Sequence, residues 1–268
     1  LPRHASDIGR RMGIHLLDDG GIRVRHDVPF SVPAHAIEPS MLSAYLNRGG
    51  GGNPVIKAFA SGTNCRLAYA EDEPEVLRDI PVVWGVLRGS DRILAQAQRQ
   101  QLHFYYIDHA YFDRGHGNSY RITRSRFEAG PVRKVSNDRL EALNVDVAPW
   151  RYNGRSIIVC PPTDYFMAAH GCSDWLETTL KTLRLETDRP IVIRQKPKPG
   201  ESSVSLAAAL RNAHALVTHS SNVAIEAACL GTPVFVSPTS AAAPVGQTKL
   251  GVIGTPPYPG GDEWVAHL

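Results

Sequence analysis

The second half of the chain constrains the fold most, because predicted strands and helices alternate along it. Short apolar runs occur at 155–162, 190–195, 214–220 and 232–238. Helix-forming segments separate them at 173–186, 202–213 and 222–231. Strands that alternate with helices of about ten residues predict a doubly wound parallel sheet with right-handed crossovers. In such sheets ligands bind at the carboxyl ends of the strands, so we look for functional residues there.

The first half shows a weaker form of the same pattern. Residues 81–87 and 102–107 read as strands, and 90–101 as a helix that Ser90 caps. Earlier, polar and apolar residues alternate around Asp18-Asp19-Gly20-Gly21, which predicts a hairpin. The glycines 49–52 predict a turn, and the apolar run 54–60 after them a strand.

A linker around Pro149 separates the two halves. We therefore expect an α/β protein of two Rossmann-like domains with mainly parallel sheets, an N-terminal domain at 1–148 and a C-terminal domain at 149–268.

Composition limits the class of protein. The 268 residues are 43% hydrophobic and 21% charged, which suits a globular core, and at about 150 residues per domain they make one or two domains. The net charge of +3 excludes a strongly cationic nucleic-acid packager. Four cysteines without a C-x-x-C pair favour neither a zinc ribbon nor a disulfide scaffold. The dispersed cysteines fit a reducing cytosol, so we expect a cytoplasmic protein. No apolar run approaches the roughly 18 residues of a membrane span, so we expect no membrane partner.

Several standard signatures are absent from the sequence. It contains no phosphate loop, no G-x-S-x-G elbow, no H-E-x-x-H and no G-x-G-x-x-G after a strand. It also lacks a D-x-D motif, so we expect no required metal. The first residue is Leu, from which we expect a trimmed chain.

The segment 214–238 is the most informative one for function. After the strand, His219, Ser220 and Ser221 form a short turn, a helix begins near Asn222, and Glu226 lies one turn inside it. Free backbone N–H groups and hydroxyls at a helix start suit a phosphate. A carboxylate in the place of Glu226 suits the vicinal hydroxyls of a ribose. The alternative is a structural helix with an exposed glutamate.

Arg194, Lys196 and Lys198 lie at or just beyond the carboxyl end of the predicted strand 190–195. Arg194 and Lys196 would face the same edge of the sheet as the Ser220 turn, where a diphosphate needs such partners. The alternative is an ordinary solvated basic loop.

Titratable groups also follow the strand at 102–107. Asp108, or His109 beside it, stands where a general base could accept a proton from an attacking hydroxyl. The alternative for Asp108 is a structural role in a turn.

Positive charge collects in residues 114–139, where seven basic and two acidic residues give a net charge of +5. Aromatic residues lie between the basic ones, a combination that suits phosphates and stacked bases. An ordinary solvated face is the alternative. The candidate nucleic-acid contacts are Arg114, Arg121, Arg124, Arg126, Arg133 and Lys134.

The order S-S-N-V-A-I-E-A-A-C-L-G-T-P-V-F-V at 220–236 resembles the nucleotide-sugar segment of GT-B glycosyltransferases and related sugar 2-epimerases. The resemblance implies two domains that face each other across a cleft. It also implies that Ser220, Ser221 and Asn222 contact the diphosphate of a nucleotide sugar, with UDP expected, that Glu226 holds the ribose and that Arg194 serves the diphosphate. The donor is then a co-substrate, and we expect no further cofactor.

A second segment, Y-I-D-H-A-Y-F-D-R-G-H at 106–116 followed by Y-R-I-T-R, is similar to phage-encoded GT-B-like glycosyltransferases. It implies a 5-hydroxymethylpyrimidine acceptor in double-stranded DNA and, for a phage protein, action in the host cytoplasm. Three alternatives stay open at this point: a surface-polysaccharide glycosyltransferase, a UDP-sugar 2-epimerase and a non-catalytic DNA-binding protein. The sequence is silent on the oligomeric state.

Overall fold

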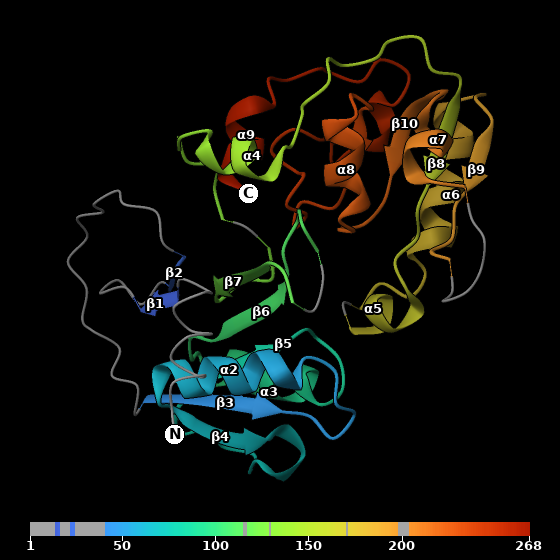
Figure 1. Cartoon of the computed structure of the whole chain (residues 1–268). Coiled ribbons are helices and arrows are strands. Elements are labelled where there is room, and N and C mark those ends of the chain that lie inside the picture. Colours follow the sequence, from blue (N-terminus) through green and yellow to red (C-terminus); the bar gives the residue numbers. More distant parts are fainter. Residues whose placement is uncertain are drawn as a thin grey trace. The chain divides into compact units, whose positions relative to one another are not determined.

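The computed structural model describes residues 14–16, 22–24, 41–114, 117–128, 130–169, 171–197 and 204–268 (Figure 1). The chain divides into two compact units, Leu1–Phe127 (unit 1) and Glu128–Leu268 (unit 2). This division falls before the expected boundary at 148/149, because α4 (Asp138–Leu143) packs against α9 (Asp262–His267) at the other end of unit 2. None of the described helices combines the length and apolarity needed to span a bilayer.

Unit 1 contains a mixed sheet with the strand order β4-β3-β5-β6-β7. The strands are β3 (Leu42–Leu46), β4 (Arg66–Tyr69), β5 (Ile80–Trp84), β6 (Tyr105–His109) and β7 (Tyr120–Arg124). Only β7 runs antiparallel to its neighbour. The order reverses between β3 and β5, which makes their carboxyl ends the topological switch point where α/β sheets bind ligands.

Helices cover both faces of this sheet. Residues of α2 (Asn53–Thr63) pack with Leu42 and Ile107 on one face, whereas residues of α3 (Ser90–Arg99) pack with Tyr45 and Tyr106 on the other. The N-cap of α3 is Gly89 rather than Ser90, whose hydroxyl donates to the Trp84 carbonyl at 3.1 Å. The doubly wound arrangement expected for the second half is thus found here too.

The strand expected at 54–60 is wrong, since these residues belong to α2. Val55, Ile56, Phe59 and Ala60 are its buried residues, and this spacing gives one apolar stripe on a helix. Gly52 before the helix adopts a left-handed conformation, with φ of 73°, which glycine tolerates at no steric cost. The positively charged segment 114–139, for which the sequence predicted no strand, contains β7. Near the N-terminus β1 (Ile14–Leu16) and β2 (Ile22–Val24) pair antiparallel, as the hairpin predicts, and the turn at 18–21 lies outside the described residues.

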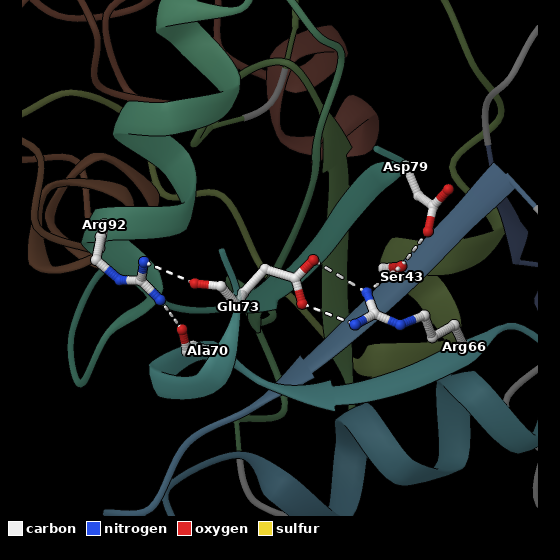
Figure 2. A network of polar contacts seen from close by, with 6 residues as sticks. All are labelled: Ser43, Arg66, Ala70, Glu73, Asp79 and Arg92. Carbon is white, nitrogen blue, oxygen red and sulfur yellow. Dashed lines mark hydrogen bonds and ion pairs between the residues drawn. The ribbon is translucent and has the colours of Figure 1, made fainter. Parts of the chain in front are cut away.

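A polar network fastens the amino edge of the unit 1 sheet (Figure 2). Arg66 forms a bidentate ion pair with the buried Glu73, at 2.9 and 3.1 Å, and donates to Ser43, which donates to Asp79 at 2.6 Å. Arg92 on α3 donates to the backbone carbonyls of Glu73 and Ala70. Ser43, Arg66 and Asp79 stand at or just before the starts of strands, so this part of the network holds the amino edge, whereas Ala70 and Arg92 follow the carboxyl ends of β4 and β5.

Unit 2 contains a fully parallel sheet in the order β11-β10-β8-β9. The strands are β8 (Ser156–Val159), β9 (Ile191–Ile193), β10 (Ala213–Val217) and β11 (Val234–Phe235), which confirms the four strands expected from the sequence. The helices around them are α5 (Asp164–Ala169), α6 (Trp175–Glu186), α7 (Leu206–Leu210) and α8 (Val223–Cys229), followed by the 3-10 turn η3 (Leu250–Val252). Here the switch point lies between β8 and β10, so the two units share one strand order.

Candidate functional site

The carboxyl ends of β8 and β10 are joined at the switch point of unit 2. The Cys160 amide donates to the Val217 carbonyl at 2.8 Å, and the buried Thr218 hydroxyl donates to the Cys160 carbonyl at 2.6 Å. These bonds hold the segment after β8 beside the segment after β10. The predicted Ser220 turn begins one residue beyond Thr218.

The turn at 219–222 offers donors for an anion. Within the described residues, the backbone N–H groups of Ser220, Ser221 and Asn222 have no hydrogen-bond partner. Both serines are half-buried, and the Ser221 hydroxyl accepts only weakly from the Val223 amide at 3.5 Å. Unsatisfied N–H groups at such a turn are suited to phosphate or carboxylate oxygens.

His219 is held among aromatic rings at the start of this turn. Its ring lies edge-on to Phe166 at 5.8 Å and to Trp175 at 6.4 Å between centroids, and its Nδ1 is 3.1 Å from the Ser220 hydroxyl. Burial lowers the pKa of His219 from its ordinary value of 6.5. The imidazole is therefore neutral at pH 7 and orients the Ser220 hydroxyl.

Arg194 reaches the same edge from β9. Its amide donates to the Val159 carbonyl at 2.8 Å, which places it next to the end of β8. Burial raises the pKa of the Cys160 thiol, and the neighbouring Arg194 guanidinium opposes that rise. The guanidinium donates to the Val204 carbonyl at 3.1 Å, and with five N–H donors it retains others for an anion. The structure thus brings Arg194 to the edge that carries the Ser220 turn, while Lys196 lies further along as an exposed residue.

Glu226 is half-buried on α8, a helix of seven residues. It lies near Cys229, whose pKa burial and this carboxylate together raise to about 11. The shortness of α8 limits its dipole, so the anion-binding capacity of this edge depends mainly on Arg194 and the turn.

In unit 1, Asp108 is held by a cluster of its own neighbours. Its Oδ2 accepts from Arg121 at 3.1 Å and from the Tyr106 hydroxyl at 2.9 Å, and its Oδ1 accepts from the His109 amide. The Arg121 side chain is only 11% exposed and lies over the Tyr111 ring at 4.8 Å. Asp108 and Arg121 are direct partners in the β6–β7 ladder, so their side chains share one face.

His109 points to the opposite face of the sheet from Asp108, because successive side chains of a strand alternate. Its ring lies edge-on to Trp84 at 5.0 Å between centroids, and Trp84 also meets Tyr120 at 5.8 Å. The two predicted base candidates therefore do not form one constellation. His109 lies with Trp84 at the switch point of unit 1, whereas Asp108 lies on the α3 side.

The glycine loop at 49–52 also belongs to the carboxyl edge of unit 1, which was not predicted from the sequence. The side-chain amide of Asn47 stabilises the glycine loop by donating to the Gly51 carbonyl at 2.7 Å, and that of Asn53 donates to the Asn47 carbonyl at 2.8 Å. A Cβ on Gly52 would overlap the Trp84 indole, and one on Gly51 would overlap the Arg88 guanidinium. Four glycines between a buried strand and an Asn-Pro helix start are the signal that identifies this loop.

The predicted nucleic-acid contacts are divided between the units. Arg114 and Arg126 are exposed in unit 1, Arg124 is half-buried there, and Arg133 and Lys134 are exposed in unit 2. Arg121 is the exception, since its guanidinium bonds to Asp108 and to the His109 and Phe127 carbonyls. In the described part of the chain, no three His, Cys, Asp or Glu side chains gather as metal ligands.

Comparison with known proteins supports the fold. No protein-family model matches the chain, and no curated protein sequence does. Two solved structures from Thermosulfurimonas dismutans are similar. The first, KpsC, beta Kdo 2,7 transferase, has a TM-score of 0.51 and 17% identity, and the match covers 84% of this chain and 89% of that one. The second, KpsC, beta Kdo 2,4 transferase, has a TM-score of 0.50 and 12% identity, and the match covers 87% of this chain and 91% of that one. At these identities the likeness concerns architecture, so the chain has the α/β fold found in these two transferases.

Proposed function

We propose that this chain is a glycosyltransferase of the GT-B type that moves a sugar from a nucleotide-activated donor to a hydroxyl group of a glycan. The observation that carries the proposal is the carboxyl edge of unit 2, where Arg194 and three N–H groups without a partner among the described residues adjoin one switch point. The fold shared with two sugar transferases supports the same class. A UDP donor remains the sequence-based expectation.

In the proposed reaction, the acceptor hydroxyl attacks the anomeric carbon and the bond to the nucleotide oxygen breaks. Arg194 and the Ser220 turn stabilise the negative charge that develops on the leaving group, which preorganised donors do well. Neutral His219 holds the Ser220 hydroxyl in place. Glu226 binds the ribose hydroxyls, and Lys196 adds a positive charge nearby.

For the base that accepts the proton we favour His109 over Asp108. Asp108 already accepts from Arg121, Tyr106 and the His109 amide, which occupies three of the roughly four lone-pair sites of a carboxylate and leaves little capacity for an attacking hydroxyl. His109 lies at the switch point with Trp84. Its position fits a base that meets a hydroxyl at the carboxyl edge.

A glycan acceptor is favoured by the kind of enzyme with which the chain shares its fold. The hydroxymethylpyrimidine acceptor stays a prediction. Arg121 was one of the residues expected to contact DNA phosphates, but its guanidinium is already bonded to Asp108. Both acceptors therefore enter the experiment.

The test incubates the chain with a pool of nucleotide sugars and either mixed oligosaccharides or hydroxymethylated DNA, and follows acceptor mass and released nucleotide. Arg194→Gln should abolish transfer, whereas Arg184→Gln, at an exposed position of α6, should leave it unchanged. A mass gain on DNA would identify the other acceptor, and an isomerised nucleotide sugar would identify an epimerase. Salt-sensitive DNA binding without nucleotide-sugar binding would indicate a non-catalytic protein.

A further inference from the structure

A cavity of about 370 Å³ lies at the amino edge of unit 2, away from the proposed donor edge. Its walls are the segment before β8, the end of α8 and the segment that leads into α9. The lining residues are Val147, Ala148, Pro149, Trp150, Ala228, Tyr258, Pro259, Gly260, Gly261 and Trp264.

The walls of this cavity are held in place by hydrogen bonds. The Ala148 amide donates to the Cys229 carbonyl at 2.7 Å. The indole N–H of Trp150 donates to the Pro259 carbonyl at 2.7 Å, and that of Trp264 donates to Ala241 at 2.7 Å. Both indoles are thereby fixed before any ligand arrives, which reduces the entropy lost on binding.

Aromatic rings continue from the cavity toward solvent. The Trp150 and Tyr258 rings are 6.4 Å apart and inclined at 55°, and Tyr152 stands 4.2 Å beyond Tyr258. Tyr152 is 68% exposed, a high fraction for a large aromatic side chain. The negative face of such rings attracts the weakly positive C–H groups of a pyranose ring.

The other wall groups narrow the ligand class. None of the lining residues carries a charge, so the cavity offers no charged partner to a phosphate or carboxylate. Gly260 and Gly261 have no side chains to cover their backbone polar groups, and an apolar ligand would desolvate these groups without replacing their hydrogen bonds. A volume near the lower end of the roughly 300–1,000 Å³ typical of ligand pockets suits one or two sugar rings.

We infer that this cavity is a second carbohydrate site, which binds a neutral pyranose of a glycan against Trp150 and Tyr258. The site goes beyond the proposed donor edge and does not depend on it. It would anchor a glycan chain away from the reacting end.

Gly261 allows the cavity to be filled without backbone strain. Its φ of −113° suits any residue, and a Cβ there would meet only Val147 at an ordinary distance of 3.9 Å. Gly261→Leu therefore places a side chain beside the cavity wall. Gly254→Leu is the matched control, because a Cβ there meets nothing within 4 Å and Gly254 does not line the cavity.

Saturation-transfer NMR with methyl β-glucoside, methyl β-galactoside and N-acetylglucosamine tests the proposal. At least one sugar should bind the wild-type chain and Gly254→Leu alike, and at least tenfold more weakly to Gly261→Leu and to Tyr258→Ser. Arg194→Gln should retain this binding even where transfer fails, which separates this site from the proposed function. The inference is overturned if no sugar binds the wild type, or if Gly261→Leu binds as well as Gly254→Leu.

Discussion

The two sheets share a strand order, but their carboxyl edges differ in which groups lie there and in how these groups are bonded. In unit 1 the glycine loop receives the Trp84 ring and the Arg88 guanidinium from its own chain, and Asp108 is bonded to Arg121. In unit 2 the backbone N–H groups of Ser220, Ser221 and Asn222 lack partners among the described residues, and Arg194 is only half-buried. One topology thus supports an edge stabilised by internal contacts and an edge with capacity for a ligand.

This contrast predicts that substitutions of the internally packed Gly52 and Arg121 in unit 1 act mainly on stability, whereas those at the unit 2 edge act mainly on binding. The effect of replacing a side chain depends on the partners that this side chain already has within the protein. A guanidinium that is bonded internally contributes to folding, and one with donors to spare contributes to recognition.

The largest effect is expected at Gly52. Gly52→Val should lower the free energy of unfolding by about 3 kcal/mol, since overpacking costs about 1–3 kcal/mol and a left-handed backbone adds about 1–2. Urea unfolding measures this change. The control Gly62→Ala, inside α2 with open space around it, should raise stability slightly. Equal stability of Gly52→Val and wild type would mean that the loop is not filled by Trp84.

Arg121→Met should cost about 2 kcal/mol of unit 1 stability, somewhat less than a fully buried pair, because Asp108 is 28% exposed. The loss arises because the Asp108 carboxylate keeps its desolvation cost without its partner. Arg126→Met, at an exposed position, should stay within about 0.5 kcal/mol of wild type. If Arg121→Met instead left stability unchanged and weakened DNA binding, Arg121 would be a phosphate contact after all.

At the unit 2 edge, Glu226→Ala should weaken nucleotide-sugar binding about tenfold, or about 1.4 kcal/mol, with little change in stability. The reason is the loss of a charged acceptor for the ribose hydroxyls. Titration calorimetry with a UDP sugar measures the affinity, and Glu177→Ala on the exposed face of α6 is the control. Unchanged affinity in Glu226→Ala would remove this residue from the donor site.

The smallest effect is a pH dependence of unit 2. Burial lowers the pKa of His214 and His219 below 6.5, so the folded state favours their neutral forms. Their contribution to stability is complete above about pH 6.5 and is lost as the pH falls through the lowered pKa values. Urea midpoints at pH 7.5 and 5.5 should show the decrease, and His214→Gln, which keeps a donor for the Ile253 carbonyl, should reduce it. A midpoint that rises on acidification would contradict this assignment.

Part of the candidate site could be predicted because its residues are close in sequence. Ser220, Ser221 and Asn222 follow one strand directly, and Arg194 follows another, so a parallel sheet brings them to one edge. The partners of Asp108 could not be predicted in the same way, because β7 was not recognised and the ion pair depends on the β6–β7 register. The strand expected at 54–60 failed because a short apolar run fits a buried helix as well as a strand.

The sequence by itself determined the alternating α/β architecture of unit 2 and the polar residues at the ends of its strands, since periodicity and strand ends are local properties. Only the tertiary structure decided that His109 and Asp108 lie on opposite faces, that Arg121 is bonded internally, and that Trp150 and Tyr258, far apart in sequence, line one cavity. The physical reason is that strand register and long-range packing fix which side chains meet. These side-chain contacts determine whether a charged or aromatic group stabilises the fold or remains available to a ligand.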